Sequence, residues 1–209
     1  MSQGGLPSGT VTFLFTDIEG STRLWENHPD EMAVALQTHD RILRSCIEDL
    51  GGYVFSTAGD AFAAAFSSAT DALGAAQAAQ RRLSTAEWPE RVPIRVRMGL
   101  HTGTADERDG DYFGPTLNRA ARIMSAAHGG QVVTSATVAD LTGAKTDLVL
   151  LGEHRLKDLS APERLFQLGV GSFPPLRTLD AVPGNLPASL TELVGRDEDL
   201  IALAELLEI

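Results

Sequence analysis

The chain has 209 residues, of which 43% are hydrophobic and 22% are charged, a composition typical of a globular protein with one ordinary domain and a small appendage. Its formal net charge of −11 argues against direct binding of nucleic acid, and no apolar run reaches the roughly 18 residues that are needed to cross a membrane. Cys46 is the only cysteine and the N-terminus has no signal-peptide pattern, so we expect a cytoplasmic protein without intrachain disulfides.

Strand-like and helix-like patterns alternate along the first 170 residues. Runs of β-branched and aromatic residues predict strands, and apolar residues at helical spacing predict helices. In the first half of the chain we expect a central strand at 10–16, a helix from Ser21 or Thr22, a helix over about 29–50, a hairpin over 51–66 and an alanine-rich helix over 67–84. A half-exposed strand over 93–103 and a loop over 103–111 follow. The last expected elements are a helix over 115–127, a short strand and a short helix after 131, and a hairpin over about 147–170. This order predicts an α+β protein with a ferredoxin-like βαββαβ core and C-terminal additions.

The composition changes after Gly171, which sets the predicted domain boundaries. Residues 172–195 are punctuated by prolines and are predicted to be a linker. Residues 196–209 continue as an amphipathic helical pattern and are predicted to begin a further module. The main domain is therefore expected at 8–171.

Two aspartates follow strand-like runs and lie at glycine turns. Asp17 ends the first strand pattern, and Asp60 lies at the tip of the 51–66 hairpin. In a ferredoxin-like sheet the first strand lies beside this hairpin, so the two carboxylates can meet. Carboxylate oxygens suit Mg²⁺ or Mn²⁺. The alternative is that Asp17 caps the following helix and that Asp60 is an ordinary turn residue.

The turn after Ile18 suits phosphate oxygens. Glu19, Gly20, Ser21 and Thr22 supply consecutive backbone N–H groups at a predicted helix start. Ordinary helix capping uses the same residue types, so the turn alone is weak evidence. Beside a metal-binding aspartate, it is typical of a site for a polyphosphate bridged by cations.

A helix further along the chain carries an amide and a guanidinium on one face. Asn118 and Arg122 are four residues apart, which places both side chains on the same side of the predicted helix. An amide suits a sugar oxygen, and arginine can bond two phosphoryl oxygens. The alternative is a solvated helix face.

These three segments, in this order, resemble the catalytic domain of class III nucleotidyl cyclases. The resemblance covers roughly residues 8–170, and the set is specific because each motif occupies its position in the family. The motifs are FTDIEGST at 15–22, GDAFAAAF at 59–66, GLHTG at 99–103, DYFGPTLNRAAR at 111–122 and GEHRLKDL at 152–159.

The resemblance implies roles for the residues that match the family pattern. Asp17 and Asp60 match the two metal-binding aspartates, and the Ile18 carbonyl joins them. Asn118 matches the residue that orients the ribose, and Arg122 matches the one that stabilises the α-phosphate in the transition state.

The base-reading positions agree with the family only in part. Asp111 matches an adenine-selecting position, and Lys157 lies near a family lysine that meets the terminal phosphates. Ser56 stands where the family has an adenine-reading lysine, four residues before the second metal-binding aspartate. Losing a charge-assisted contact to the base could cost about 1.5–3 kcal/mol. Base choice is therefore weakly specified, with ATP preferred because of Asp111.

The resemblance implies an enzyme that converts ATP to cyclic AMP and pyrophosphate with two Mg²⁺ or Mn²⁺ ions per site. In the family the aspartates and the Asn–Arg pair of one site come from different subunits, so we expect a homodimer with composite sites. We expect this fragment to bind neither nucleic acid nor membrane. Two alternatives stay open: a pseudo-cyclase that serves as a nucleotide sensor or dimerisation module, and a ferredoxin-like interaction domain that binds no nucleotide.

The residues after the linker resemble the start of another module. LVGRDEDL at 193–200 looks like the beginning of a STAND-type ATPase. This arrangement is similar to actinobacterial regulators that join a cyclase domain to an ATPase and a LuxR-type helix-turn-helix. Neither a P-loop nor a helix-turn-helix pattern is present, so we expect the chain to be a piece of a longer transcriptional regulator.

Overall fold

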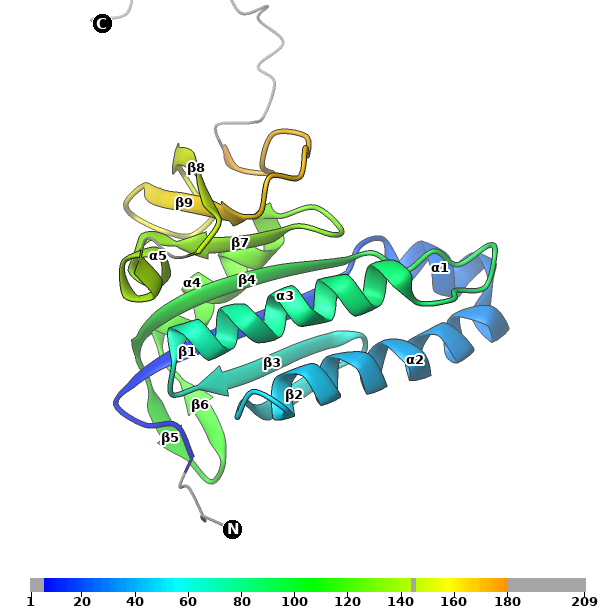
Figure 1. Ribbon diagram of the computed structural model, residues 1–209, viewed down its shortest axis with the longest axis horizontal. Coiled ribbons are helices and arrows are strands. Elements are labelled where there is room, and N and C mark those ends of the chain that lie inside the picture. The colour runs from blue at the N-terminus through cyan, green and yellow to red at the C-terminus, as the bar shows by residue number, and fades with distance from the viewer. Residues whose placement is uncertain (1–5, 144–145, 180–209) are drawn as a thin grey trace, which may run out of the picture.

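A seven-stranded sheet with the strand order β2-β3-β1-β4-β7-β9-β8 forms the centre of the fold (Figure 1). The computed structural model describes residues 6–143 and 146–179. The elements are β1 (Thr10–Ile18), α1 (Ser21–Asn27), α2 (Pro29–Glu48), β2 (Tyr53–Ala58), β3 (Ala61–Phe66), α3 (Ala69–Thr85), β4 (Val96–Thr104), β5 (Asp106–Arg108), β6 (Asp111–Phe113), α4 (Pro115–Ala126), β7 (Val132–Ser135), α5 (Ala136–Thr142), β8 (Leu148–His154) and β9 (Glu163–Leu168).

The first four strands of the large sheet confirm the ferredoxin-like core. β1 lies between β3 and β4 and is antiparallel to both, as a βαββαβ unit requires. On one face of the sheet, Leu14 and Ile18 pack with Leu43 of α2 and Ala76 of α3 in the main hydrophobic core. On the other face, Phe13 packs in a cluster with residues of α4. β1 therefore runs through the middle of a three-layer structure, and at its C-terminal end Ile18 is buried while Asp17 is partly exposed.

Small residues let α3 approach the sheet closely. The hydroxyl of Ser68 caps this helix by accepting a hydrogen bond from the Asp71 N–H, and Ala72, Ala76 and Ala79 are buried along one stripe. Neither α3 nor any other helix in the described part of the chain is long and apolar enough to span a membrane.

The C-terminal additions extend the same sheet. β7 pairs with β4 in parallel, and the expected hairpin over 147–170 is present as β8 and β9. The strand predicted as half-exposed is buried over residues 98–102, because it lies in the centre of the sheet between helices.

The stretch predicted as a loop over 103–111 contains structure of its own. β4 continues to Thr104, and β5 and β6 form a two-stranded ribbon. Asp109 and Gly110, at the tip between the two strands, both have positive φ angles, of 53° and 82°. An Asp-Gly pair with two positive φ angles is the preferred two-residue hairpin turn, so the signal was present in the sequence and the prediction of a loop was wrong.

The predicted linker begins as packed structure. Residues 172–179 lie against the domain, and Leu176 is only 4% exposed in a cluster with residues of α4, β7 and β9. The rest of the predicted linker, 180–195, and the predicted further module, 196–209, lie outside the described residues.

Candidate active site

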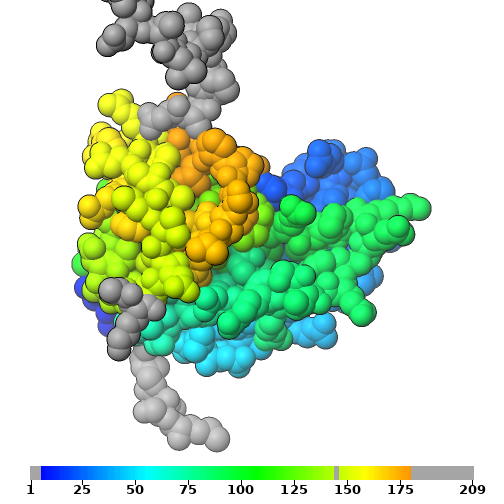
Figure 2. Space-filling model, turned by 45° about the horizontal axis from the view of Figure 1, so that its top comes forward, coloured from blue at the N-terminus to red at the C-terminus, as the bar shows by residue number. Residues whose placement is uncertain are grey.

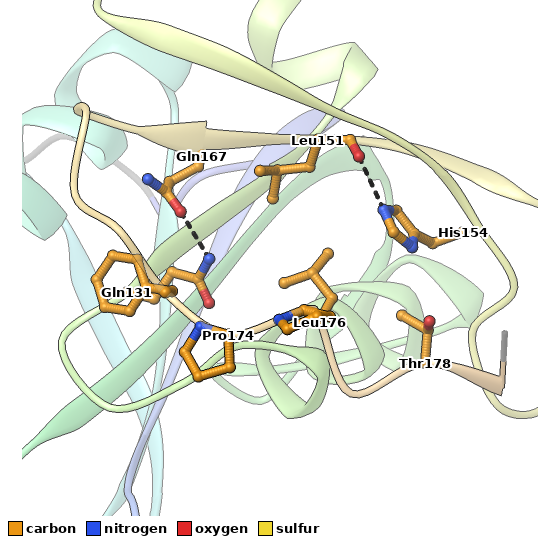
Figure 3. Close-up of a pocket in the computed structure, with 9 residues that line it drawn as sticks. Gln131, Leu151, His154, Gln167, Pro174, Leu176 and Thr178 are labelled. Carbon is orange, nitrogen blue, oxygen red and sulfur yellow. Dashed lines mark hydrogen bonds between the residues drawn. The ribbon is translucent and has the colours of Figure 1, made fainter. Parts of the chain in front are cut away.

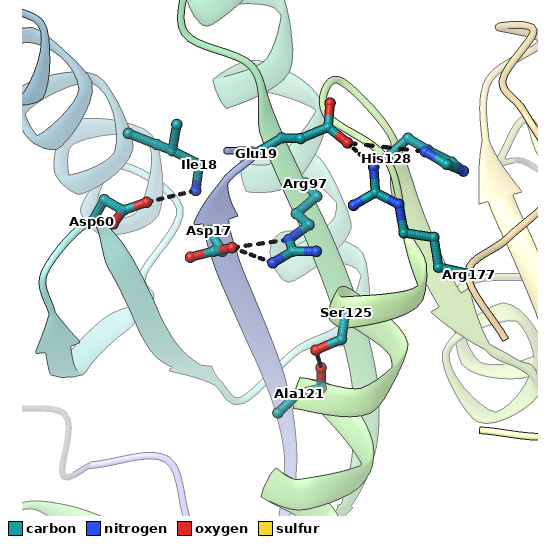
Figure 4. Close-up of polar contacts among 9 residues, drawn as sticks. All are labelled: Asp17, Ile18, Glu19, Asp60, Arg97, Ala121, Ser125, His128 and Arg177. Atoms are coloured by element: carbon teal, nitrogen blue, oxygen red, sulfur yellow. Dashed lines mark hydrogen bonds and ion pairs between the residues drawn. The ribbon is translucent and has the colours of Figure 1, made fainter. Parts of the chain in front are cut away.

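The ends of β1 and β3 bring the two predicted metal-binding aspartates to one end of the sheet (Figure 4). The pairing of these strands stops at Thr16 and Phe62. Beyond that point, the N–H of Ile18 donates a hydrogen bond of 2.9 Å to Oδ2 of Asp60. The Asp60 carboxylate thus replaces a strand carbonyl and lies beside the residue that follows Asp17.

Arg97 lies on the first of these carboxylates and was not singled out from the sequence. It is the direct cross-strand partner of Asp17, and its Nε and Nη2 donate to the same Oδ2 at 2.9 and 2.5 Å. The two side chains are 23% and 21% exposed, so solvent screens the pair only in part. The one sequence signal was the alternation of Arg95 and Arg97 in the predicted neighbouring strand.

The oxygen atoms at this point suit a hard divalent cation. Oδ1 of Asp17 and Oδ1 of Asp60 have no hydrogen-bond partner among the described residues, so each carboxylate keeps one oxygen for a ligand. Nowhere in the described ranges do three His, Cys, Asp or Glu side chains gather into a possible metal site. Ions held by Asp17, Asp60 and the Ile18 carbonyl would need water and phosphate oxygens as further ligands, as Mg²⁺ usually does.

The turn after Ile18 leaves three backbone amides free. Gly20 adopts the left-handed conformation with φ of 72°, which glycine tolerates best, and starts α1. The N–H groups of Gly20, Ser21 and Thr22 make no hydrogen bond within the described residues, so they are available to a ligand. The N–H of Glu19 donates instead to the Arg95 carbonyl at 2.9 Å.

The side chain of Glu19 also points away from the aspartate pair. Its Oε1 pairs with Nη2 of Arg177 and lies 3.9 Å from Nδ1 of His128 (Figure 4). The amide and the carboxylate of Glu19 are therefore both engaged within the chain, whereas the sequence predicted a role in binding substrate.

Asn118 and Arg122 lie on α4, which packs against β1 and β4. Asn118 is exposed, and Nη2 of Arg122 pairs with Oδ2 of Asp158 at 2.5 Å. Lys157 is exposed and forms no ion pair in the described part of the chain. No hydrogen bond or ion pair among the described residues connects Asn118, Arg122 or Lys157 to the aspartates.

A β-bulge decides which way Ser56 faces. The register between β2 and β3 shifts at Phe55, so that Ser56 pairs with Ala63, which in turn pairs with Phe15 of β1. Directly paired residues share a face of the sheet, and Phe15 shares its face with Asp17 two residues later. The bulge therefore places Ser56 on the face of the sheet that carries Asp17. Without the bulge, Ser56 would lie on the same face as Val54, which is the opposite one.

Asp111 begins β6, which is anchored next to β2. The neighbouring Tyr112 is buried, its ring lies 5.0 Å from that of Phe55, and its hydroxyl donates to the Pro7 carbonyl at 2.6 Å. Burial, together with the nearby charges of Glu107 and Tyr53, raises the pKa of Tyr112 to about 12, so the hydroxyl stays protonated and keeps this anchor. The rings of Phe55 and Tyr112 contact each other, and the two predicted base-reading residues are their sequence neighbours: Ser56 follows Phe55, and Asp111 precedes Tyr112.

Both the sequence and the fold are similar to those of known proteins. Residues 6–168 match the family model described as the adenylate and guanylate cyclase catalytic domain. The chain belongs to this family. A solved structure of an adenylate cyclase of Trypanosoma brucei, in its monomeric state, superposes with a TM-score of 0.77 at 32% identity over 85% of this chain and 98% of that one.

Curated relatives of this cyclase domain fall into two groups. An uncharacterized protein of Mycobacterium tuberculosis is 45% identical over 201 residues, which cover 91% of this chain and 68% of that protein. The adenylate cyclase of Neurospora crassa is 39% identical over 154 residues, but these cover 62% of this chain and only 7% of that enzyme. The shared part is the catalytic domain of a much larger protein in the second case.

One buried histidine of the cyclase domain has a structural role. His101 lies inside β4 at 5% exposure, and its Nδ1 bonds to Oγ of Ser135 at 2.8 Å. Burial, with a smaller contribution from the charge of Arg119, lowers the pKa of His101 to about 4. The ring is therefore neutral near pH 7 and connects β4 to β7 through its hydrogen bond.

Proposed function

We propose that this cyclase domain converts ATP to 3′,5′-cyclic AMP and pyrophosphate at a site shared by two copies of the chain. The observation that carries the proposal is the contact between the Asp60 carboxylate and the N–H of Ile18, next to Asp17. It supports a metal site formed by the two aspartates and the Ile18 carbonyl. The trypanosomal and fungal relatives are named adenylate cyclases, which favours ATP over GTP.

The reaction is an intramolecular phosphoryl transfer in which the ribose 3′-oxygen attacks the α-phosphorus and pyrophosphate leaves. Two Mg²⁺ or Mn²⁺ ions, when bound to Asp17, Ile18 and Asp60, would lower the pKa of the 3′-hydroxyl and neutralise the triphosphate. The free amides of Gly20, Ser21 and Thr22 hold phosphate oxygens.

Arginine and asparagine side chains complete the proposed site. Arg97 neutralises Asp17, and its guanidinium would be available to phosphate oxygens if a cation were bound at that carboxylate. Arg122 stabilises the charge that develops on the α-phosphoryl group, and Asn118 orients the ribose. Lys157 meets the terminal phosphates.

The aspartate pair and the pair Asn118–Arg122 lie on different elements of one chain, which supports a site composed of two chains. Asn118 and Arg122 lie on α4 and form no hydrogen bond or ion pair with the aspartate pair in the described ranges. A head-to-tail pair of chains would supply the aspartates from one copy and α4 from the other, and two-fold symmetry would make two equivalent sites.

The test of the proposal is direct detection of the product. The purified 209-residue chain is incubated with Mn²⁺ and either ATP or GTP, and cyclic nucleotide is separated by chromatography. Formation of cyclic AMP supports the proposal. Saturable, Mn²⁺-dependent binding of ATP without any cyclic product would instead favour a pseudo-cyclase, the alternative that Ser56 supports.

A single substitution tests the base-reading position. Ser56→Lys is expected to raise kcat/KM for ATP about tenfold, because a lysine would restore a charge-assisted contact with the adenine. Ser56→Gln, which is uncharged, one bond shorter than lysine and still a hydrogen-bond donor, serves as the control and is expected to have a smaller effect. Unchanged or lower activity of Ser56→Lys would show that Ser56 does not face the base.

The wider context of the domain is also a proposal. The catalytic unit is proposed to cover residues 8–171, followed by a linker and by an ATPase-like module from 196, in an actinobacterial regulator of the LuxR type. The motif LVGRDEDL supports this arrangement, and the single cysteine is consistent with a cytoplasmic location.

A further inference from the structure

The segment 172–179 contacts three elements that carry proposed substrate-binding residues. The Arg177 N–H donates to the Ala126 carbonyl at 2.9 Å, at the C-terminal end of the helix that carries Arg122. The Leu179 N–H donates to the Arg155 carbonyl at 3.0 Å, next to the loop that carries Lys157. The Arg177 side chain reaches the third element, at Glu19.

The segment is fixed to the domain independently of this side chain. Leu176 is buried in the cluster with α4, β7 and β9, and Nε2 of His128 bonds to the Pro175 carbonyl at 2.9 Å. Beneath the segment lies a pocket of about 470 Å³, where the side chains of Gln131 and Gln167 bond to each other at 2.7 Å (Figure 3). The Arg177 guanidinium therefore extends from an anchored backbone.

Glu19 is held tightly on the side opposite the aspartates. Gly129 packs against it, and a Cβ at this glycine would lie 2.8 Å from Oε2 of Glu19 and 2.6 Å from Cβ of Arg95. With Arg177 and His128 at Oε1 and Gly129 beside Oε2, the Glu19 carboxylate is contacted on two sides.

On its far side the turn that follows is restrained through α1, where Leu24 packs partly buried against the main core. None of the residues of α1 is fully buried, and no side chain caps its first turn. Gly20 is conformationally permissive, so the direction of the free amides of Gly20, Ser21 and Thr22 depends on how Glu19 is held. Segment 172–179 (orange) faces this part of the chain (blue) across a recess of about 890 Å³ (Figure 2).

We propose that Arg177 is a positioning residue of the cyclase site: through its ion pair with Glu19 it fixes the turn 19–22 in the conformation that receives the nucleotide phosphates. The inference rests on the proposed function for its substrate.

The experiment compares Arg177→Ala, Arg177→Lys and the control Arg44→Ala in the 209-residue chain. Arg44 serves as a control because it forms an exposed ion pair with Glu48 on α2 and makes no hydrogen bond or ion pair with segment 172–179. Its guanidinium also lies 5.6 Å from the Phe62 ring, so this variant additionally controls for the loss of an arginine beside β3. Arg177→Ala is expected to raise both KM and the Kd for Mn²⁺–ATP about tenfold with kcat changed less than about threefold, because binding rather than chemistry is impaired. Arg177→Lys should recover most of the affinity, and Arg44→Ala should behave as wild type.

A double-mutant cycle separates positioning from a direct charge effect on the triphosphate. If Arg177 acts through Glu19, then Glu19→Gln weakens binding as Arg177→Ala does, and the double variant is no worse than either single variant. If Arg177 attracts the phosphates directly, Glu19→Gln leaves binding unchanged or improves it, and the proposal is overturned.

The remaining outcomes are also decisive. KM and Kd values for Arg177→Ala within about twofold of the Arg44→Ala control would refute the positioning role. If the wild-type chain binds Mn²⁺–ATP but forms no cyclic product, the proposed reaction is refuted. The Kd values of Arg177→Ala and Arg44→Ala then still test whether Arg177 positions the turn. If the wild-type chain binds no nucleotide, both proposals fail.

Discussion

Asp17→Asn and Arg122→Ala are each expected to reduce the formation of cyclic nucleotide by on the order of 10³-fold, because each removes a charge that acts on the reacting groups. Asp17→Asn leaves a neutral ligand at the proposed metal site. Arg122→Ala leaves the charge on the α-phosphoryl group without its counter-charge. Product formation at saturating Mn²⁺–ATP measures both effects.

Mixing these two inactive variants tests whether a site is built from two chains. If the aspartates come from one copy and Arg122 from the other, half of the dimers in an equal mixture contain both variants, and each such dimer has one intact site. About a quarter of wild-type activity should therefore return. A site contained within one chain would give no recovery, and that result would refute the composite site.

Controls must show that the losses do not come from unfolding. Asp17→Asn leaves Arg97 without its carboxylate, which we expect to cost about 1–2 kcal/mol of folding stability. Thermal unfolding of each variant measures this cost. Asp49→Asn, at the residue that follows α2, and Arg44→Ala, on α2, make the same chemical changes at exposed positions, and both variants should retain full activity.

The arrangement of the aspartates was predictable because it follows from topology. A ferredoxin-like strand order places the first strand beside the following hairpin, whatever the side chains do. Asp17 at the end of one strand and Asp60 at the tip of the other must then lie at the same end of the sheet. Only the apolar pattern and the glycine turns were needed to reach this conclusion.

Features that depend on tertiary contact were not predictable. The prolines of segment 172–179 are typical of a linker. The segment nevertheless packs on the domain, because Leu176 contacts a cluster of residues from three elements that are distant in sequence. The bulge at Phe55 changes the face on which Ser56 lies, although no residue of β2 signals it. The sequence predicted that Arg97 lies in a strand, but it did not predict the contact with Asp17. That contact depends on the register between two strands 80 residues apart, which the local sequence does not determine.

Gly99→Ala is expected to destabilise the fold by about 3 kcal/mol, because there is no space for a side chain at this position. Gly99 lies in β4 directly beneath α4. A Cβ at residue 99 would lie 2.2 Å from the backbone nitrogen of Met124 and 2.5 Å from its Cα. Both are main-chain atoms, so no rotamer change can relieve the contact, and α4 as a whole must move away from the sheet.

Displacement of α4 should also affect catalysis, because the helix carries both Asn118 and Arg122. A shift of about 1 Å in a catalytic group can lower the rate about 100-fold, so we expect Gly99→Ala to lose activity even under conditions where it stays folded. Thermal unfolding and product formation, measured at a temperature well below the transition, separate the two effects.

A second Gly→Ala change in the same chain provides the contrast. Gly74 lies within α3, where an added Cβ would lie 3.3 Å from Cδ1 of Leu50, the end of a flexible side chain that can move aside. Gly74→Ala is therefore expected to stabilise the protein by about 0.5–1 kcal/mol through helix propensity, with activity unchanged. Adding Met124→Ala to Gly99→Ala should give no rescue, since the clash involves atoms that alanine keeps. Recovery of stability in that double variant would mean that the Met124 side chain, and not the backbone of α4, sets the distance between this helix and the sheet.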